Sequence, residues 1–158
     1  MIVRFLTFLI LLGLSMRVFA LEDSMLKSIE VSASGNKFQA ERVKIAAENL
    51  ANEDSVSMNP GGEPYRRKVI YAKNSYDRKL KTRLVKVKKY DHDRKTPLKM
   101  KYDPNHPGAD ENGYVKLPNV DKMIEKADAN EAQRSYEANL GMIEVSKQMI
   151  NKTIEAMR

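Results

Sequence analysis

Apolar residues in the first third of the chain recur at helical spacing. Between Glu22 and Asn52 they lie three, four or seven residues apart, which places them on one face of an amphipathic helix. This face comprises Leu26, Ile29, Ala33, Ala40, Val43, Ala47 and Leu50. Gly35 costs a helix interior about 1 kcal/mol relative to alanine, so we expect a bend or a close contact there. Asn52 suits the C-terminal cap of a helix that we assign to residues 21–53.

The pattern changes to alternation in the middle of the chain. The stretches "YRRKVIYA", "RLVKVKKY" and "PLKMKYD" alternate apolar or aromatic residues with lysine and arginine, as strands with one solvated face do. They predict a small antiparallel β unit over residues 65–103. The stretch "YDPNHPGADENGYVKLPNV" that follows is rich in proline and glycine, so we expect an ordered loop and no strand. Residues 54–118 would thus form a β-rich basic insert with a Pro/Gly loop.

A second helical pattern occupies residues 119–158, with Asn119 or Asp121 as its N-cap. Its apolar positions are Tyr136, Leu140, Ile143, Ile150 and Ile154, widened by Met123, Ala127, Met142, Val145 and Met149. The predicted fold is α+β, with long N- and C-terminal helices that bracket a small antiparallel insert. Two such helices carry more apolar surface than the insert can cover, and this surplus predicts assembly with other chains.

The first twenty residues have the pattern of a secretory leader. Arg4 precedes an apolar run that is too short to span a bilayer as a helix, and Val18-Phe19-Ala20 fits a cleavage site. We therefore expect cleavage between Ala20 and Leu21, and contact with a membrane through this leader alone. A second interpretation places the true start at Met25.

Positive charge is concentrated in the insert. Residues 66–102 hold 15 Lys or Arg against three Asp, a net charge of +12, and tyrosines lie among them. Such a surface could bind nucleic acid. However, the basic residues alternate with apolar ones, as on the solvated face of a sheet, and no base-stacking motif is present. We expect no nucleic-acid partner.

The sequence offers little for catalysis or metal binding. It has no cysteine, and its two histidines, His92 and His106, lack the three or four converging ligands that a metal site needs. The serines lie outside nucleophile motifs, and Gly61-Gly62 lacks the context of a phosphate loop. We expect no enzymatic activity, no metal and no cofactor.

Four stretches together resemble a known family. They are "SASGNKFQAERVKIAAENLAN", "GGEPYRRK", "YDPNHPGADENGYVKLPNV" and "EAQRSYEANLGMIEVSKQMINKT", in this order. From about Met25 to its C-terminus, the chain resembles the proximal rod proteins of the bacterial flagellar basal body. Members of this family typically carry no cleavable signal, so the leader sets this chain apart from them.

The resemblance implies a structural subunit without cofactor, located in the basal body in the periplasmic space. Its terminal helices would pair as a coiled coil and assemble with other rod subunits and with copies of itself, so that the rod transmits torque and supports motility. The alternative is a basic periplasmic or cytosolic binding module for an anionic polymer.

Carried over by position, the family's "NLAN" and "SYEANL" elements supply most of an expected assembly interface. Tyr136 and Leu140 would be knobs in a helical seam, while Arg134, Glu137 and Asn139 would fix its register through polar contacts. The expected interface comprises Asn49, Leu50, Ala51, Asn52, Tyr136, Glu137, Ala138, Asn139, Leu140, Ile143 and Ile150.

Overall fold

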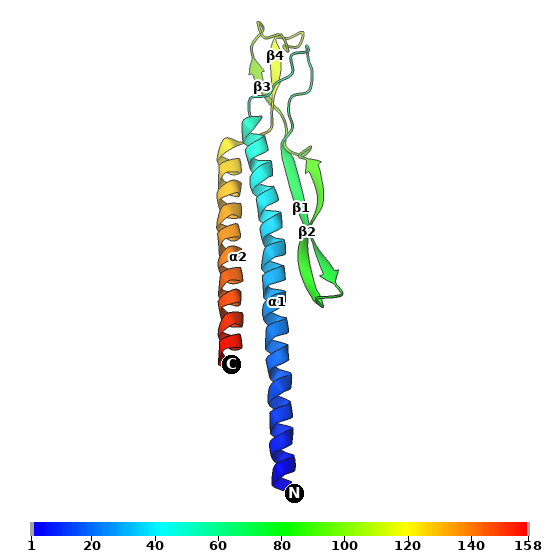
Figure 1. The fold of residues 1–158 in the computed structure, drawn as a ribbon. Helices are drawn as coiled ribbons and strands as arrows, with labels where there is room; N and C mark the ends of the chain where they lie inside the picture. The colour runs from blue at the N-terminus through cyan, green and yellow to red at the C-terminus, as the bar shows by residue number, and fades with distance from the viewer. Residues whose placement is uncertain (1, 158) are drawn as a thin grey trace.

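Two long helices and two β-hairpins build the molecule (Figure 1). The computed structural model describes the backbone of residues 2–157 and the side chains of residues 24–157. The elements are α1 (Ile2–Ala51), β1 (Lys68–Asp77), β2 (Thr82–His92), β3 (Lys99–Tyr102), β4 (Tyr114–Leu117) and α2 (Lys122–Ala156). The predicted α+β class is confirmed, because two long helices bracket a small antiparallel β region.

The elements lie around α1 (Figure 1). α2 runs antiparallel beside it, and the β1–β2 hairpin contacts α1 on the side away from α2. The β3–β4 hairpin lies at the end where α1 stops and α2 begins. α1 extends beyond the C-terminus of α2 at the opposite end.

The helix ends follow the sequence signals. After α1, the Nδ2 of Asn52 donates to the carbonyl of Glu48 at 2.8 Å. Asp121 caps α2, because its Oδ1 accepts from the backbone N–H groups of Met123 and Ile124 at 2.9 and 3.2 Å. α1 begins at Ile2, so the leader-like block continues the predicted N-terminal helix. Within the described residues, no helix has the length and hydropathy needed to cross a membrane.

The β region differs from the prediction in two ways. The expected single unit over residues 65–103 is divided between two separate two-stranded sheets, β1–β2 and β3–β4. The stretch predicted as a loop without a strand contains β4, which pairs with β3 from Lys99↔Leu117 to Tyr102↔Tyr114. The alternation in Tyr114–Leu117 is only four residues long and ends at a proline, so it was hidden among turn residues. Val115, which is 3% exposed, anchors this strand.

The longer sheet is a hairpin with one irregularity. β1 and β2 pair antiparallel from Lys68↔His92 to Asp77↔Thr82. The register shifts between Tyr71 and Ala72, which pair with Lys89 and Val87, so Lys88 is the extra residue of a bulge. A two-stranded hairpin is marginally stable alone, and this one is supported by its packing on α1.

The contact between α1 and α2 repeats every seven residues along α1. Ser28 meets Ser146, with 3.5 Å between their Oγ atoms. One step further, a Cβ added at Gly35 would lie 2.7 Å from the Nδ2 of Asn139. The next step brings Arg42 to the Asp128 and Glu131 carboxylates, at 3.9 and 3.7 Å. The last step joins Asn49 to Glu125. We call these contacts the helix seam.

Small and polar residues dominate the buried side of each helix. On α1 the buried residues include Ser32, Asn36 and Asn49, whereas Leu26 of the predicted apolar face is 54% exposed. On α2 the buried residues are Glu125, Ala132 and Ser146. Small side chains let two helices approach closely. The predicted apolar faces are therefore mostly outside the contact between the helices of one chain.

Candidate assembly surface

Asn49 lies at the centre of the place where the helices meet the β region. Its side chain is 0% exposed. Its Oδ1 accepts from the backbone N–H of Lys68 and from the hydroxyl of Tyr65, both at 2.8 Å. Its Nδ2 donates to the Lys68 carbonyl at 3.0 Å and to Glu125 Oε2 at 2.9 Å. The amide thus uses its full hydrogen-bonding capacity inside the chain. Burial raises the pKa of the Tyr65 phenol, which keeps this donor protonated.

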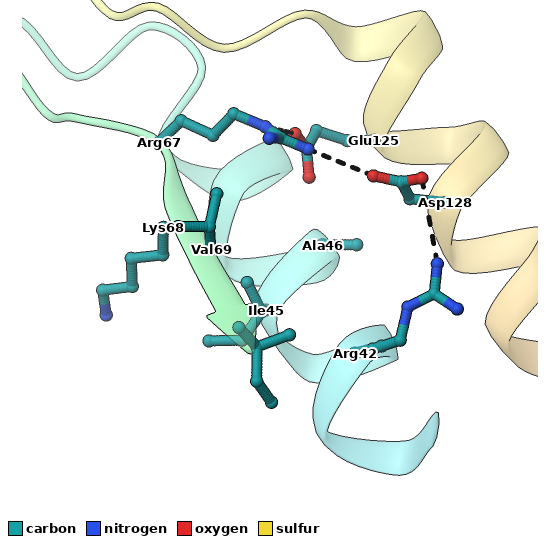
Figure 2. Close-up of a pocket in the computed structure, with 9 residues that line it drawn as sticks. Arg42, Ile45, Ala46, Arg67, Lys68, Val69, Glu125 and Asp128 are labelled. Carbon is teal, nitrogen blue, oxygen red and sulfur yellow. Dashed lines mark hydrogen bonds and ion pairs between the residues drawn. The ribbon is translucent and has the colours of Figure 1, made fainter. Parts of the chain in front are cut away.

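Glu125, which bonds to Asn49, also forms an ion pair with Arg67 (Figure 2). Glu125 is 1% exposed, and its Oε1 accepts from Nε of Arg67. The Nη2 of Arg67 reaches Asp128 at 3.1 Å. Burial acts to lower the pKa of Arg67, but the hydrogen bond and the charge of Glu125 outweigh it, so the pKa is raised. The guanidinium stays charged, and the buried carboxylate stays paired.

Asn119 completes this arrangement from the segment before α2. It is 4% exposed, and its Oδ1 accepts from the backbone N–H of Arg67 at 2.8 Å. Its Nδ2 donates to the carbonyls of Asp93 and Thr96, at 2.8 and 3.2 Å. Asn49, Arg67, Asn119 and Glu125, which we call the junction, therefore tie together α1, β1, the turn after β2 and α2.

Two junction residues, Arg67 and Glu125, line a small open pocket of about 210 Å³ between α1, β1 and α2 (Figure 2). Its charged lining residues already have ion-pair partners within the chain, so the site serves the internal structure of the chain. Sequence reasoning placed Asn49 in an interface and missed Arg67 and Glu125. The signal for Asn49 was the "NLAN" element, carried over by position from the family resemblance.

The expected interface residues fall into three groups. Asn49 is buried inside the chain. Leu50, Asn52, Asn139, Ile143 and Ile150 are half-buried, with Asn139 in the helix seam. Ala51, Tyr136, Glu137, Ala138 and Leu140 are exposed. The side chains of Ala20 and Leu21, the expected cleavage site, lie outside the described residues.

α2 carries apolar residues on both flanks of the helix seam. Residues three or four apart share a helix face, so positions on either side of Asn139 form two lines along α2. The first row comprises Tyr136, Leu140, Ile143, Ile150 and Ile154, and the second row comprises Ala138, Met142, Val145 and Met149. Leu140 is 50% exposed and Met142 51% exposed. Contiguous exposed apolar surface of this kind marks a site of protein association.

The two histidines lie in separate places, one in a turn and one at the end of a strand. His106 accepts at Nδ1 from the backbone N–H of Gly108 at 3.0 Å, within a turn of the Pro/Gly loop. His92 is exposed at the end of β2. Among the described residues, no three His, Asp or Glu side chains are grouped so that they could hold a metal ion.

Comparison with known proteins places the chain among flagellar proteins. Residues 111–156 match the model of the family described as flagellar basal body rod FlgEFG protein C-terminal. The flagellar basal-body rod protein FlgC of Agrobacterium fabrum is 40% identical over 136 residues, which cover 86% of this chain and 97% of that protein. FlgC of Salmonella typhimurium is 38% identical, covering 83% and 96%, and FlgC of Borreliella burgdorferi is 35% identical, covering 85% and 98%.

The chain belongs to the FlgC family of flagellar basal-body rod proteins. As a FlgC-family member it is a structural rod subunit and not an enzyme. It is located in the flagellar basal body, where it is expected to assemble with other basal-body components. The alternative of a binding module for an anionic polymer has no support among these relatives. The 111–156 match includes Glu125, Asn139 and Ser146, which form the α2 side of the helix seam.

Proposed function

We propose that this chain is a subunit of the proximal part of the rod, on the periplasmic side, and that it transmits torque through packed helices. In this proposal α1 and α2 pair as an antiparallel coiled coil. The two apolar rows of α2 pack against neighbouring rod subunits, which include copies of the same chain. The observation that carries the proposal is the position of the apolar rows outside a polar helix seam.

The seven-residue repeat of the helix seam supports coiled-coil pairing, because this is the repeat that keeps two helices in continuous contact. Ser28, Gly35 and Ala132 are small, so the two backbones lie close together there. The apolar residues that would fill the seam of an ordinary coiled coil are left on the flanks. A helix with apolar residues on both flanks suits a layer in which every helix pair has a neighbour on each side.

The junction gives this layer a fixed attachment to the insert. Asn49 and Glu125 hold α1 and α2 in one register, and Arg67 and Asn119 fix where β1 leaves the helices. We infer that residues 21–53 and 119–158 are the rod helices, that residues 54–118 are the insert, and that residues 1–20 are a removable leader. Force on the helices would reach the insert through buried hydrogen bonds.

Leu140→Asp tests the proposal. Leu140 is half exposed, so the free chain should keep its fold. In the assembled rod an unpaired buried carboxylate would cost several kcal/mol, so incorporation into sedimented basal bodies should fail. Gln148→Asp adds the same charge at an exposed position of α2 outside both rows, and it should incorporate normally. Normal incorporation of Leu140→Asp, and of Met142→Asp in the second row, would refute assembly through these rows.

A further inference from the structure

One end of the β1–β2 hairpin carries a dense positive charge. Residues 73–88, which we call the basic end, contain seven Lys or Arg and a single acidic residue. The seven are Lys73, Arg78, Lys79, Lys81, Arg83, Lys86 and Lys88. This end lies along α1 on the side away from α2, so it is separate from the apolar rows (Figure 1).

Asp77 is the single acidic residue within the basic end, and its charge acts on Lys86 and Lys79. Within the described residues, none of the seven cations is within ion-pair distance of a carboxylate; the hairpin's ion pairs are those of Lys68 and Lys89, at its other end. Asp77 is occupied in the turn, where its Oδ1 accepts from the backbone N–H groups of Lys79 and Leu80 at 2.9 and 3.1 Å. Most of the positive charge of the basic end is thus left for solvent or for a partner.

The strand register also brings like charges together. Lys73 lies directly opposite Lys86 in the ladder, an arrangement that destabilises a sheet. The exposed Tyr76, at 60%, lies opposite Arg83 on the same hairpin. Tyrosine and arginine are enriched in protein interfaces. A repulsive pair beside an exposed aromatic residue breaks a local rule of sheet stability, and such exceptions occur at functional sites.

A second copy of this chain can supply only part of the missing negative charge, because residues 21–158 outside the 66–102 stretch carry a net charge of −7 against +12 within it. The full chain has a net charge of +7, and removing residues 1–20, with Arg4 and Arg17, would still leave +5. Copies packed in one layer would accumulate this excess. The excess that copies leave uncompensated favours a different molecule as the source of counter-charge, and this chain is a rod subunit expected to assemble with other basal-body proteins.

We propose that the basic end is a docking surface for an acidic surface of a different protein of the basal body. Lys73, Arg83 and Lys86 supply the charge, and Tyr76 supplies a flat contact area. Docking here is independent of helix packing, because the hairpin and α2 lie on opposite sides of α1.

The test places a photo-crosslinking amino acid at Tyr76 in flagellated cells and identifies the captured peptide by mass spectrometry. The expected product is an acidic peptide of another basal-body protein. Lys86→Glu should reduce its yield about tenfold, because a close charge contact becomes repulsive. This change also gives Lys73 an opposite charge across the ladder, so the hairpin should be no less stable. Lys95→Glu changes the net charge equally, outside the basic end, and should keep the yield.

Charge reversal in the captured peptide, from acidic to lysine, should restore crosslinking in the Lys86→Glu chain. Products with another copy of this chain, with nucleic acid or with a polysaccharide would overturn the proposal, and so would a yield that Lys86→Glu leaves unchanged. Sedimentation of the same chains with basal bodies reads rod incorporation separately. A loss of crosslinking with normal incorporation therefore concerns the basic end alone.

Discussion

Replacing Asn49 with alanine would remove the one side chain on which α1, β1 and α2 all depend. The amide makes four hydrogen bonds, two of them to the backbone of Lys68. Tyr65 and Lys68 are only half-buried, so water can replace some of these partners. Glu125 keeps its bond to Arg67. A buried polar group without a partner costs about 1–3 kcal/mol, so we expect a total loss of about 2–4 kcal/mol.

The measurement is urea unfolding of the purified chain, with hydrogen exchange at the Lys68 amide as a local readout. Exchange at Lys68 should become faster in Asn49→Ala, because this amide loses its acceptor. Asn151→Ala is the matched control: Asn151 is exposed on α2, and the better helix propensity of alanine should change stability by about 0.5 kcal/mol at most. The argument fails if Asn49→Ala lies within about 0.5 kcal/mol of the natural chain, or if exchange at Lys68 is unchanged.

Three further outcomes are expected. Gly141→Ala should stabilise α2 by about 0.5–1 kcal/mol in thermal unfolding, because no neighbouring element lies within 4 Å of the added carbon. Gly35→Ala should stabilise the chain less, or destabilise it, because the added carbon would lie 2.7 Å from the Asn139 side chain of the opposite helix. The hydrogen bond from the backbone N–H of Leu80 is the largest cause lowering the pKa of Asp77 below its ordinary 3.8, so the turn is stabilised above that value and loosens as the pH falls through the lowered pKa. Protection of the turn amides against exchange, relative to an unstructured chain at the same pH, should therefore fall in acid, and less so in Asp77→Asn. Mass spectrometry of protein from cells should find Leu21 at the N-terminus if the leader is cleaved, Met25 if synthesis starts there, and intact Met1 only if the leader is retained.

The helices were predictable because their signals are local. Apolar periodicity sustained over many turns identifies a helix whatever the residues contact, and the caps at Asn52 and Asp121 depend on nearby backbone groups alone. Gly35 was also recognisable as a point of close contact, since a helix keeps glycine in its interior at a cost. The β4 strand was missed because four alternating residues carry too little pattern among prolines and glycines.

The buried face of each helix was not predictable in the same way. Periodicity reports that an apolar neighbour exists but not whether it belongs to the same chain, so it could not tell which apolar residues, such as the half-exposed Leu140 and Met142, lie outside the contact between α1 and α2. The junction could not be found either, because its four members come from positions 49, 67, 119 and 125, and none has a distinctive neighbour in the sequence. Only the folded topology brings them together.

The register of the helix seam also determines how far α2 is paired with α1 for each possible N-terminus of the chain. Counting back from Ser28 opposite Ser146, Leu21 falls opposite Thr153 and Met25 opposite Met149. In a chain cut after Ala20, α1 would pair with almost all of α2, and the two helices would end at nearly the same level. A chain starting at Met25 would leave about two turns of α2, with Ile154, as an overhang that only a neighbouring subunit can complete. The choice of start site would then decide whether the two helices end together or whether the last turns of α2 are left for a neighbouring subunit to cover.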